Sequence, residues 1–279
     1  MFLQRNTALI SPYPVSSPMP ELPEVERAAI IARGIAVGRT ITSVTVRHRA
    51  QRRGLPAKDA RSLVGDRVLA VERRGKSQRF HLESGRDLQV HFRMTGDWAI
   101  PGPGPLPPTV RAIIAFDDGS RLALDDPRAL SVLSLCDTGR DEDPLGPDAT
   151  DPALSADYLA NALASRRIPI KVALLDQATV AGIGNIYASE ALWRARIDPR
   201  TPAQQLSRVR LSRLVKAIQA TMRDALKRQS RYYGSEDPEP EARFAVYDRE
   251  GEACRRCRKK IRRITQAARS TYFCGNCQS

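Results

Sequence analysis

Short alternations of apolar and polar residues fill the chain between residues 40 and 136, as in Arg67-Val68-Leu69-Ala70-Val71. Turn residues such as Asp118-Gly119 separate the later runs, and each run has the length of a half-buried strand. A single helical pattern, EVERAAIIARGI at residues 24 to 35, precedes them and is expected to end at Gly34. The pattern predicts a β-sandwich or barrel with one helix. The expected strands cover residues 40–47, 66–74, 77–83, 86–93, 110–117, 120–126 and 129–136.

The pattern changes to helical after residue 154. Residues 137–154, DTGRDEDPLGPDATDPAL, are acidic, rich in Pro and Gly and without periodicity, which predicts a linker. Helical periodicity follows at residues 157–166, 170–178, 185–195 and 206–229. PGPGPLPPT at 101–109 and SRYYGSEDPEPEAR at 230–243 are expected to be loops. We therefore expect a β-sandwich domain at 19–136, a helical domain at 155–243 and a small cysteine-containing domain at 244–279.

The net charge of the chain indicates what kind of partner it binds. The formal net charge is +14 and the pI about 10.1, which favours a polyanionic partner. From Cys254 to Ser279 there are eight basic residues and no acidic one, so the charge is concentrated at the C-terminal end. Nucleic acid is the best first expectation. An anionic membrane surface is the alternative, but no amphipathic helix accompanies the charge, and no apolar run of about 18 residues exists to span a bilayer.

Two cysteine pairs near the C-terminus have the spacing of a metal site. Cys254-x2-Cys257 and Cys274-x2-Cys277 are separated by sixteen residues, 258 to 273. Two knuckles with two thiolates each form the tetrahedron that zinc prefers, and four thiolates leave no open position for catalysis. Disulfides and redox pairs are the competing interpretations, but no secretory context supports oxidation. The pattern predicts one structural Zn²⁺ that folds a basic hairpin.

Two further stretches carry candidate chemistry. Gly182, Gly184 and Asn185 directly precede a helical pattern, which suits a phosphate at a helix N-terminus, with Asn185 as N-cap; an ordinary capped helix–turn–helix is the equally simple alternative. MPELPEVERA at residues 19 to 28 reads like the start of a protein, although it lies eighteen residues into this chain. Residues 1–18 are too weakly apolar for a secretory signal and are expected to be a disordered extension or an upstream mis-assigned start.

PELPEVE, GIGNIYASEAL and the four-cysteine finger occur here in the order found in the formamidopyrimidine-DNA glycosylase family, which the chain resembles from Met19 to its C-terminus. PELPEVE is more similar to the formamidopyrimidine branch than to the endonuclease VIII branch, which typically reads PEGPE. The resemblance implies an α+β fold with an N-terminal β-sandwich, a helix–two-turn–helix domain and a zinc-finger β-hairpin. It implies a bifunctional DNA glycosylase/AP lyase that excises oxidised bases of the formamidopyrimidine and 8-oxoguanine class.

The resemblance also implies site residues. The family nucleophile is an N-terminal proline, here Pro20 once translation starts at Met19 and the Met is removed. Glu21 corresponds to the catalytic acid that protonates the sugar ring oxygen, and Glu24 is expected to cap nearby amides. Lys76 corresponds to the strand lysine of β-elimination and Arg269 to the finger arginine that assists δ-elimination. DNA contacts are implied for His91, Met94, Arg128, Leu130, Arg166 and Asn185.

Three departures bear on the substrate. DPRALS replaces the family's DPRRFG, so Ala129 and Leu130 stand where a second Arg and an intercalating Phe are usual. A histidine usual after the Pro-rich loop falls near Thr109, and the loop around residues 229–243 is shorter and acidic. The resemblance therefore leaves two alternatives open. One is the same chemistry on oxidised pyrimidines or other lesions, and the other is a DNA-binding protein without catalysis if the extension blocks Pro20.

The expected partner is double-stranded damaged DNA, bound by a monomer without membrane association. The expected location is the bacterial cytoplasm, at the nucleoid. No organic cofactor is implied, because the amine itself forms the electrophile. A zinc-ribbon protein of RNA or the ribosome would explain the charge and the finger but not PELPEVE.

Overall fold

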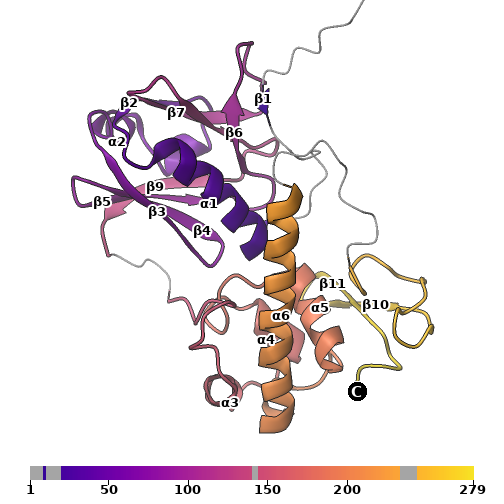
Figure 1. Ribbon diagram of the computed structural model, residues 1–279. Coiled ribbons are helices and arrows are strands. Elements are labelled where there is room, and N and C mark those ends of the chain that lie inside the picture. The colour runs from indigo at the N-terminus through magenta and orange to yellow at the C-terminus, as the bar shows by residue number, and fades with distance from the viewer. Residues whose placement is uncertain (1–8, 11–19, 140–143, 233–243) are drawn as a thin grey trace, which may run out of the picture. The chain divides into compact units, whose positions relative to one another are not determined.

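The computed structural model describes residues 9–10, 20–139, 144–232 and 244–279, with the backbone alone for residues 9–10 and 229–232. The described residues up to 139 form one compact unit and those from 144 onward a second. Each unit is an independent packing of its own elements (Figure 1). Within these described ranges, no helix combines the length and the apolar character that crossing a bilayer requires.

The first unit consists of two antiparallel sheets and one long helix (Figure 1). The order of the five-stranded sheet is β1-β6-β8-β7-β2, and that of the four-stranded sheet is β3-β4-β5-β9. Side chains of both sheets and of the helix share one apolar core, so the predicted β-sheet half is confirmed. The elements are β1 (Leu9–Ile10), α1 (Leu22–Ala36), β2 (Ile41–Val46), the 3-10 helix η1 (Gln51–Arg53), α2 (Ala57–Ser62), β3 (Val68–Arg74), β4 (Ser77–Leu82), β5 (Arg86–His91), β6 (Asp97–Pro101), β7 (Val110–Phe116), β8 (Arg121–Asp125) and β9 (Val132–Asp137).

Helix α1 extends past the position where the sequence predicts its end. It continues through Gly34 to Ala36, and the chain turns at Gly38 with a φ of +82°. A glycine inside a helix costs only about 1 kcal/mol. The buried stripe that contains Ala28, Ala32 and Ala36 outweighs this cost because it packs into the core. The predicted helix is confirmed, and its predicted end at Gly34 is wrong.

Strands β1 and β6 are not predicted from the sequence. β6 is five residues long and passes directly into the Pro-rich segment, whose remainder, residues 102–109, is the expected loop. Leu9 and Ile10 pair antiparallel with Pro101 and Ile100 at the edge of β6. The rest of the expected N-terminal extension lies outside the described residues, as does most of the expected loop at 230–243.

The second unit is helical and ends in a β-hairpin, as the sequence predicts (Figure 1). Strands β10 and β11 pair antiparallel from Arg262–Phe273 to Gln266–Arg269. A small core beneath them contains Val246, Ile261 and two of the cysteines. The elements are α3 (Ala156–Leu163), α4 (Ile170–Leu175), α5 (Asn185–Ala195), the 3-10 helix η2 (Ala203–Gln205), α6 (Arg208–Tyr232), β10 (Arg262–Gln266) and β11 (Arg269–Phe273).

Candidate functional site

The N-terminus of α1 carries the first two candidate residues. Pro20 directly precedes Glu21, which is the N-cap of α1 and is 2% exposed. The backbone N–H of Glu21 donates to Oε2 of Glu24 at 3.0 Å, and the Glu21 side chain accepts from the backbone of Glu24. This reciprocal capping box satisfies two amides at the helix start, where negative charge is also favoured. The capping role expected for Glu24 is confirmed, and the exchange holds Pro20 at the start of a rigid element.

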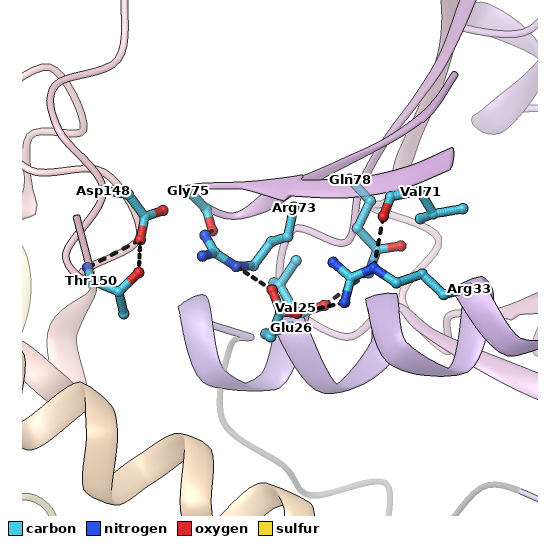
Figure 2. Close-up of polar contacts among 9 residues, drawn as sticks. All are labelled: Val25, Glu26, Arg33, Val71, Arg73, Gly75, Gln78, Asp148 and Thr150. Atoms are coloured by element: carbon cyan, nitrogen blue, oxygen red, sulfur yellow. Dashed lines mark hydrogen bonds and ion pairs between the residues drawn. The ribbon is translucent and has the colours of Figure 1, made fainter. Parts of the chain in front are cut away.

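Charged side chains clamp α1 onto strand β3 (Figure 2). Glu26 on α1 lies between Arg33 and Arg73, and its two carboxylate oxygens accept from them at 2.7 Å each. Arg33 also donates through Nε to the carbonyl of Val71 at 2.7 Å. Arg73 lies near the end of β3, three residues before Lys76 in the turn that follows. The clamp therefore fixes the helix that presents Pro20 to the sheet edge that presents Lys76.

A buried glutamine makes a second connection between α1 and the sheets. Gln78 is fully buried; its Nε2 donates to the carbonyl of Val25 at 3.0 Å (Figure 2), and its Oε1 accepts from Trp98 Nε1 at 2.7 Å. Trp98 in turn packs edge-to-face against Phe80 and Phe92 at 5.8 and 5.9 Å. Gln78 thus joins the helix to the centre of the core.

Replacing Gln78 with Leu should destabilise the first unit by about 1–3 kcal/mol, because the buried Trp98 N–H loses its acceptor. Urea unfolding followed by far-UV circular dichroism measures the loss, because this signal does not depend on Trp98. The double variant Gln78→Leu/Trp98→Phe removes both polar partners and should recover part of the stability relative to Gln78→Leu. A double variant less stable than the sum of the two single losses would contradict the assigned hydrogen bond.

Lys76 and His91 lie close together across the β4–β5 pair. Lys76 is half-buried in the turn before β4, and Ser77 beside it pairs with His91. Burial, followed by the charges of Arg93 and Lys76, lowers the pKa of His91 to about 4. His91 Nδ1 accepts from the backbone N–H of Arg93 at 2.9 Å, which leaves the proton of the neutral ring on Nε2. His91 can therefore offer one N–H donor to an oxyanion without being charged.

The lowered pKa of His91 predicts an acid-side loss of stability. The unfolded chain binds this proton near pH 6.5 and the folded chain only near pH 4, so stability is fully present above the unfolded value and falls as pH drops from 6.5 toward 4. His91→Gln should lose less stability than the parental protein across that window. Urea midpoints at neutral and at mildly acid pH measure the difference, and parallel losses in both proteins would refute the assignment.

Three of the expected DNA-contact residues, Met94, Arg128 and Leu130, lie near one another in the first unit. Arg128 Nη1 lies 3.3 Å from Met94 Sδ, and Met94 and Leu130 are 37% and 40% exposed. Ala129 between Arg128 and Leu130 has a φ of +54°, so the loop turns sharply and presents its neighbours outward. Arg128 and Leu130 lie on one exposed turn, residues 126–131, and Met94 contacts it through Arg128; we call this turn the inserting loop after the role that the sequence predicts for it.

Asp126 organises the inserting loop and was not singled out by sequence reasoning. It is fully buried, and its carboxylate accepts from the backbone N–H groups of Arg128 at 3.2 Å and Ser131 at 2.7 Å. The hydroxyls of Thr95 and Ser131 also donate to it. Thr95 follows Met94, so a single carboxylate ties both parts of the loop region together. An Asp before Pro in a turn is the signal that could have indicated it.

In the second unit, a buried lysine links the turn before α5 to the finger. Lys171 is fully buried, and its Nζ donates to Asn185 Oδ1 at 2.6 Å, to the Ser270 carbonyl at 3.0 Å and to Thr271 Oγ1 at 2.7 Å. Asn185 Nδ2 also donates to the Ser270 carbonyl at 3.0 Å. The structure therefore places Asn185 beside the strand that begins at Arg269. Sequence reasoning missed Lys171 because it lies in an apolar helical pattern.

One sequence expectation for this unit needs correction. Gly184, not Asn185, is the N-cap of α5, and Asn185 is the first helical residue, because its side chain is engaged by Lys171 and the finger. Gly182 has a φ of +91°, which explains the glycine in this turn. Arg166 forms an ion pair with Asp176 at 2.6 Å within the same unit. It is thus engaged with a carboxylate and does not join the Asn185 group.

The finger hairpin presents Arg269 at its tip. Ala267 and Ala268 both have positive φ, 46° and 58°, and form the two-residue turn between β10 and β11. Such a turn requires left-handed residues and usually selects Asn-Gly. Arg269 follows directly and is exposed. Arg269 therefore lies in the residue position directly before Ser270, whose carbonyl accepts from Asn185.

The four cysteines form a compact group that fits a metal ion. The Sγ atoms all lie within 4.8 Å of one another in this group of four, Cys254, Cys257, Cys274 and Cys277. Burial acts to raise the pKa of Cys254, but backbone hydrogen bonds from Arg256 and Cys257 outweigh it and lower this pKa to about 6. Burial and the neighbouring thiols raise the pKa of Cys277 to about 12. Four thiolates this close repel one another, so a cation is needed to ionise all of them, and an all-sulfur tetrahedron suits zinc.

Comparison with known proteins agrees with this architecture. Models of the formamidopyrimidine-DNA glycosylase N-terminal domain, the formamidopyrimidine-DNA glycosylase H2TH domain and a zinc finger found in FPG and IleRS match residues 19–133, 145–235 and 251–279. Formamidopyrimidine-DNA glycosylases of Novosphingobium aromaticivorans and Bordetella avium are 38% and 40% identical to this chain. They match 93% of this chain and 100% and 99% of their own lengths.

Solved structures of the same class are also similar. The MutM (Fpg) protein from Thermus thermophilus superposes with a TM-score of 0.81 at 34% identity, over 93% of this chain and 98% of its own. The Lactococcus lactis Fpg in complex with THF-DNA and an inhibitor gives 0.84 at 28% identity, over 93% and 100%. The fold and the family matches together are those of a DNA-repair glycosylase. The chain belongs to the formamidopyrimidine-DNA glycosylase family, whose members are DNA glycosylases with AP lyase activity.

Proposed function

We propose that this protein excises oxidised purines of the formamidopyrimidine and 8-oxoguanine class from duplex DNA, with Pro20 as the nucleophile. The observation that carries the proposal is the position of Pro20, directly before the capped and clamped start of α1 and beside the buried carboxylate of Glu21. A terminal proline is a secondary amine, and α-amino groups titrate near 7.7–8.0, so roughly a tenth is neutral at pH 7. A proline inside a chain has an amide nitrogen without this reactivity.

The proposed reaction begins with attack by the Pro20 nitrogen on C1′ of the damaged nucleotide. The new N–C1′ bond forms as the bond from C1′ to the base breaks, and the base leaves with the electron pair and takes up a proton. Glu21 protonates the ring oxygen, the sugar opens, and the amine becomes an iminium. The iminium acidifies the C2′ proton, whose removal expels the 3′ phosphate, and a second elimination expels the 5′ phosphate. Hydrolysis of the adduct restores the amine.

The other assigned residues bind and position DNA in this proposal. Lys76 supplies a proton during β-elimination, and Arg269 holds the phosphates beside the lesion and assists δ-elimination. Met94, Arg128 and Leu130 fill the gap left when the base is everted. His91 and Asn185 contact phosphates; the latter position is supported by its link to the finger strand. Arg166 would join them only after leaving Asp176. One structural Zn²⁺ held by the four cysteines folds the finger.

The start of the reactive chain is part of the proposal. The family match begins at residue 19, and the Novosphingobium aromaticivorans relative is matched over its whole length by 93% of this chain. Both observations support Met19 as the start that exposes Pro20 after removal of the methionine. If residues 1–19 stay attached, the protein would bind damaged DNA without forming the iminium.

Oxidised pyrimidines are the alternative substrate class, and two residues that differ from the usual family sequence support it. Leu130 and Ala129 replace the family's usual Phe and Arg, and one structurally similar Lactococcus lactis Fpg is described in complex with DNA that contains an oxidised pyrimidine. Single-turnover excision from otherwise identical duplexes with 8-oxoguanine, formamidopyrimidine or an oxidised pyrimidine decides between the classes. Faster release of the oxidised pyrimidine would overturn the purine preference, and release of none of them would overturn the glycosylase proposal.

A further inference from the structure

A dense basic segment follows strand β2 and has no role in the site described above. Six basic side chains between residues 47 and 61 are exposed, with Asp59 as the single acidic residue in this stretch. None of the six forms an ion pair with another residue in the described part of the chain. We call them the basic rim: Arg47, Arg49, Arg52, Arg53, Lys58 and Arg61.

One buried hydrogen bond ties the basic rim to the inserting loop. Gln51, at the start of η1, is 1% exposed, and its Nε2 donates to the carbonyl of Ser131 at 2.8 Å. Gly54, at the end of η1, approaches β9 so closely that a Cβ would lie 2.3 Å from the carbonyl oxygen of Leu133. The rim residues Arg52 and Arg53 are therefore held next to the base of the inserting loop.

A second tether reaches the same loop from the other end of the segment. The backbone N–H of Arg47 donates to the carbonyl of Arg111 on β7 at 2.7 Å. The guanidinium of Arg111 donates to the carbonyls of Asp126 at 2.6 Å and Pro127 at 2.9 Å. The part of the segment from Arg47 to Gly54 is thus tethered directly, or through Arg111, to residues 126–133.

The rim is also organised before any partner binds. The backbone N–H groups of Arg52 and Arg53 donate to the carbonyls of His48 and Ala50 at 3.3 Å, which closes η1. Arg52 Nε donates to the carbonyl of Val46 at 3.2 Å, so its charge is held near the end of β2. A partner would therefore meet positive charge that is already ordered, at a reduced entropic cost.

We propose that the basic rim binds backbone phosphates of the duplex arm next to the lesion and so extends the DNA footprint to one side of the inserting loop. This inference rests on the proposed function, because it takes the inserting loop to enter the duplex at the lesion. Exposed arginines almost without acidic neighbours recognise phosphates independently of base sequence, through release of condensed counterions. A membrane surface fits less well, because the segment carries no exposed large apolar side chain among its arginines.

The test uses two duplexes with a tetrahydrofuran abasic analogue placed off centre. One has about four base pairs on the 5′ side and about twelve, roughly one helical turn, on the 3′ side; the other is its mirror arrangement. The parental protein should bind one duplex at least about tenfold more tightly. The variant Arg49→Gln/Arg52→Gln/Arg53→Gln should lose this preference, and its salt slope on the favoured duplex should fall by about 2–3 units.

The matched control removes the same number of charges elsewhere. Arg213→Gln/Lys216→Gln/Arg223→Gln changes three exposed residues of α6 and should keep the preference between the two duplexes. The variant Arg49→Lys/Arg52→Lys/Arg53→Lys keeps the charges and should also retain it. Equal binding of the two duplexes by the parental protein, or equal losses in the rim and α6 variants, would overturn the proposal.

Failure of the rim and failure of the proposed function are distinguishable. Borohydride trapping of Pro20 by the parental protein reports the proposed function and does not depend on which arm is long. A Pro20 adduct together with equal binding of the two duplexes would refute phosphate binding by the basic rim and leave the proposed function intact. No adduct and no binding of either duplex would refute both the proposed function and phosphate binding by the rim.

Discussion

Borohydride added to this protein and an 8-oxoguanine duplex is expected to trap a covalent adduct on Pro20 when the chain starts at Met19, and none when residues 1–19 remain attached. The physical reason is the nitrogen: only a terminal proline has a free amine, and borohydride reduces the iminium that the amine forms. Mass spectrometry of the cross-linked peptide identifies the residue. The expected difference between the two chains is complete, since an amide nitrogen cannot form the adduct at all.

Two variants test the assigned roles in the same assay. Pro20→Gly keeps a primary amine and should slow trapping without abolishing it. Glu21→Gln should slow base release by about 100-fold or more, the scale of general acid catalysis, while DNA binding is largely retained. If both variants excise at the parental rate, the active site is not at the start of α1.

An abasic duplex separates the two ways in which the first experiment can fail. It exposes the lyase step whatever base the pocket prefers, so an adduct there but not with 8-oxoguanine would move the substrate to another lesion. Absence of an adduct with both duplexes, from the chain that starts at Met19, would indicate a DNA-binding protein without catalysis.

Removal of the metal is the second change with a large expected effect. Structural zinc in small fingers contributes about 10–16 kcal/mol to folding, and the hairpin has only a small core of its own. Without the metal, four crowded thiols remain and the strand that carries Arg269 loses its support. Cys254→Ser/Cys277→Ser, or a chelator, should therefore lower affinity for a damaged duplex by at least about tenfold, with loss of the bound zinc.

The chain contains its own control for this experiment. Cys136 on β9 belongs to the first unit and its Sγ lies 3.7 Å from the Asp87 carbonyl, within the four-stranded sheet. Cys136→Ser should leave the zinc content and the DNA affinity unchanged. Parental affinity after confirmed zinc loss would exclude the finger from DNA binding.

The predicted elements that rely on local pattern are confirmed where the pattern is long or strongly alternating. β3, β5 and β7 lie where alternation places them, and α5 and α6 where helical spacing places them. β6 was missed because five residues that include one Trp beside a Pro-rich loop carry little periodicity. The end of α1 was misplaced because packing of Ala36 outweighs the glycine signal at Gly34.

The site shows the same division. The family motifs indicate Pro20, Glu21 and the four cysteines directly, because their chemistry depends on residue type and short spacing. Lys171 and Gln78 carry no such pattern. Both are buried polar residues whose partners lie at distant positions in the chain, as with Lys171 and Thr271. Asp126 follows a turn pattern, but its contact with Thr95 also joins distant positions. Their value as organisers comes from burial, which makes every unmet hydrogen bond costly.

Residue identities alone are sufficient to predict the fold class, the family, the four metal-binding cysteines and the dependence of the proposed reaction on a free amine at Pro20. These follow from residue identity, spacing and charge, which are local properties. The folded chain was needed to show that Asn185 contacts the finger strand rather than capping α5, and that Arg166 is paired with Asp176. It was also needed to place part of the basic rim near the inserting loop, because the contact of Gln51 with Ser131 joins residues eighty positions apart.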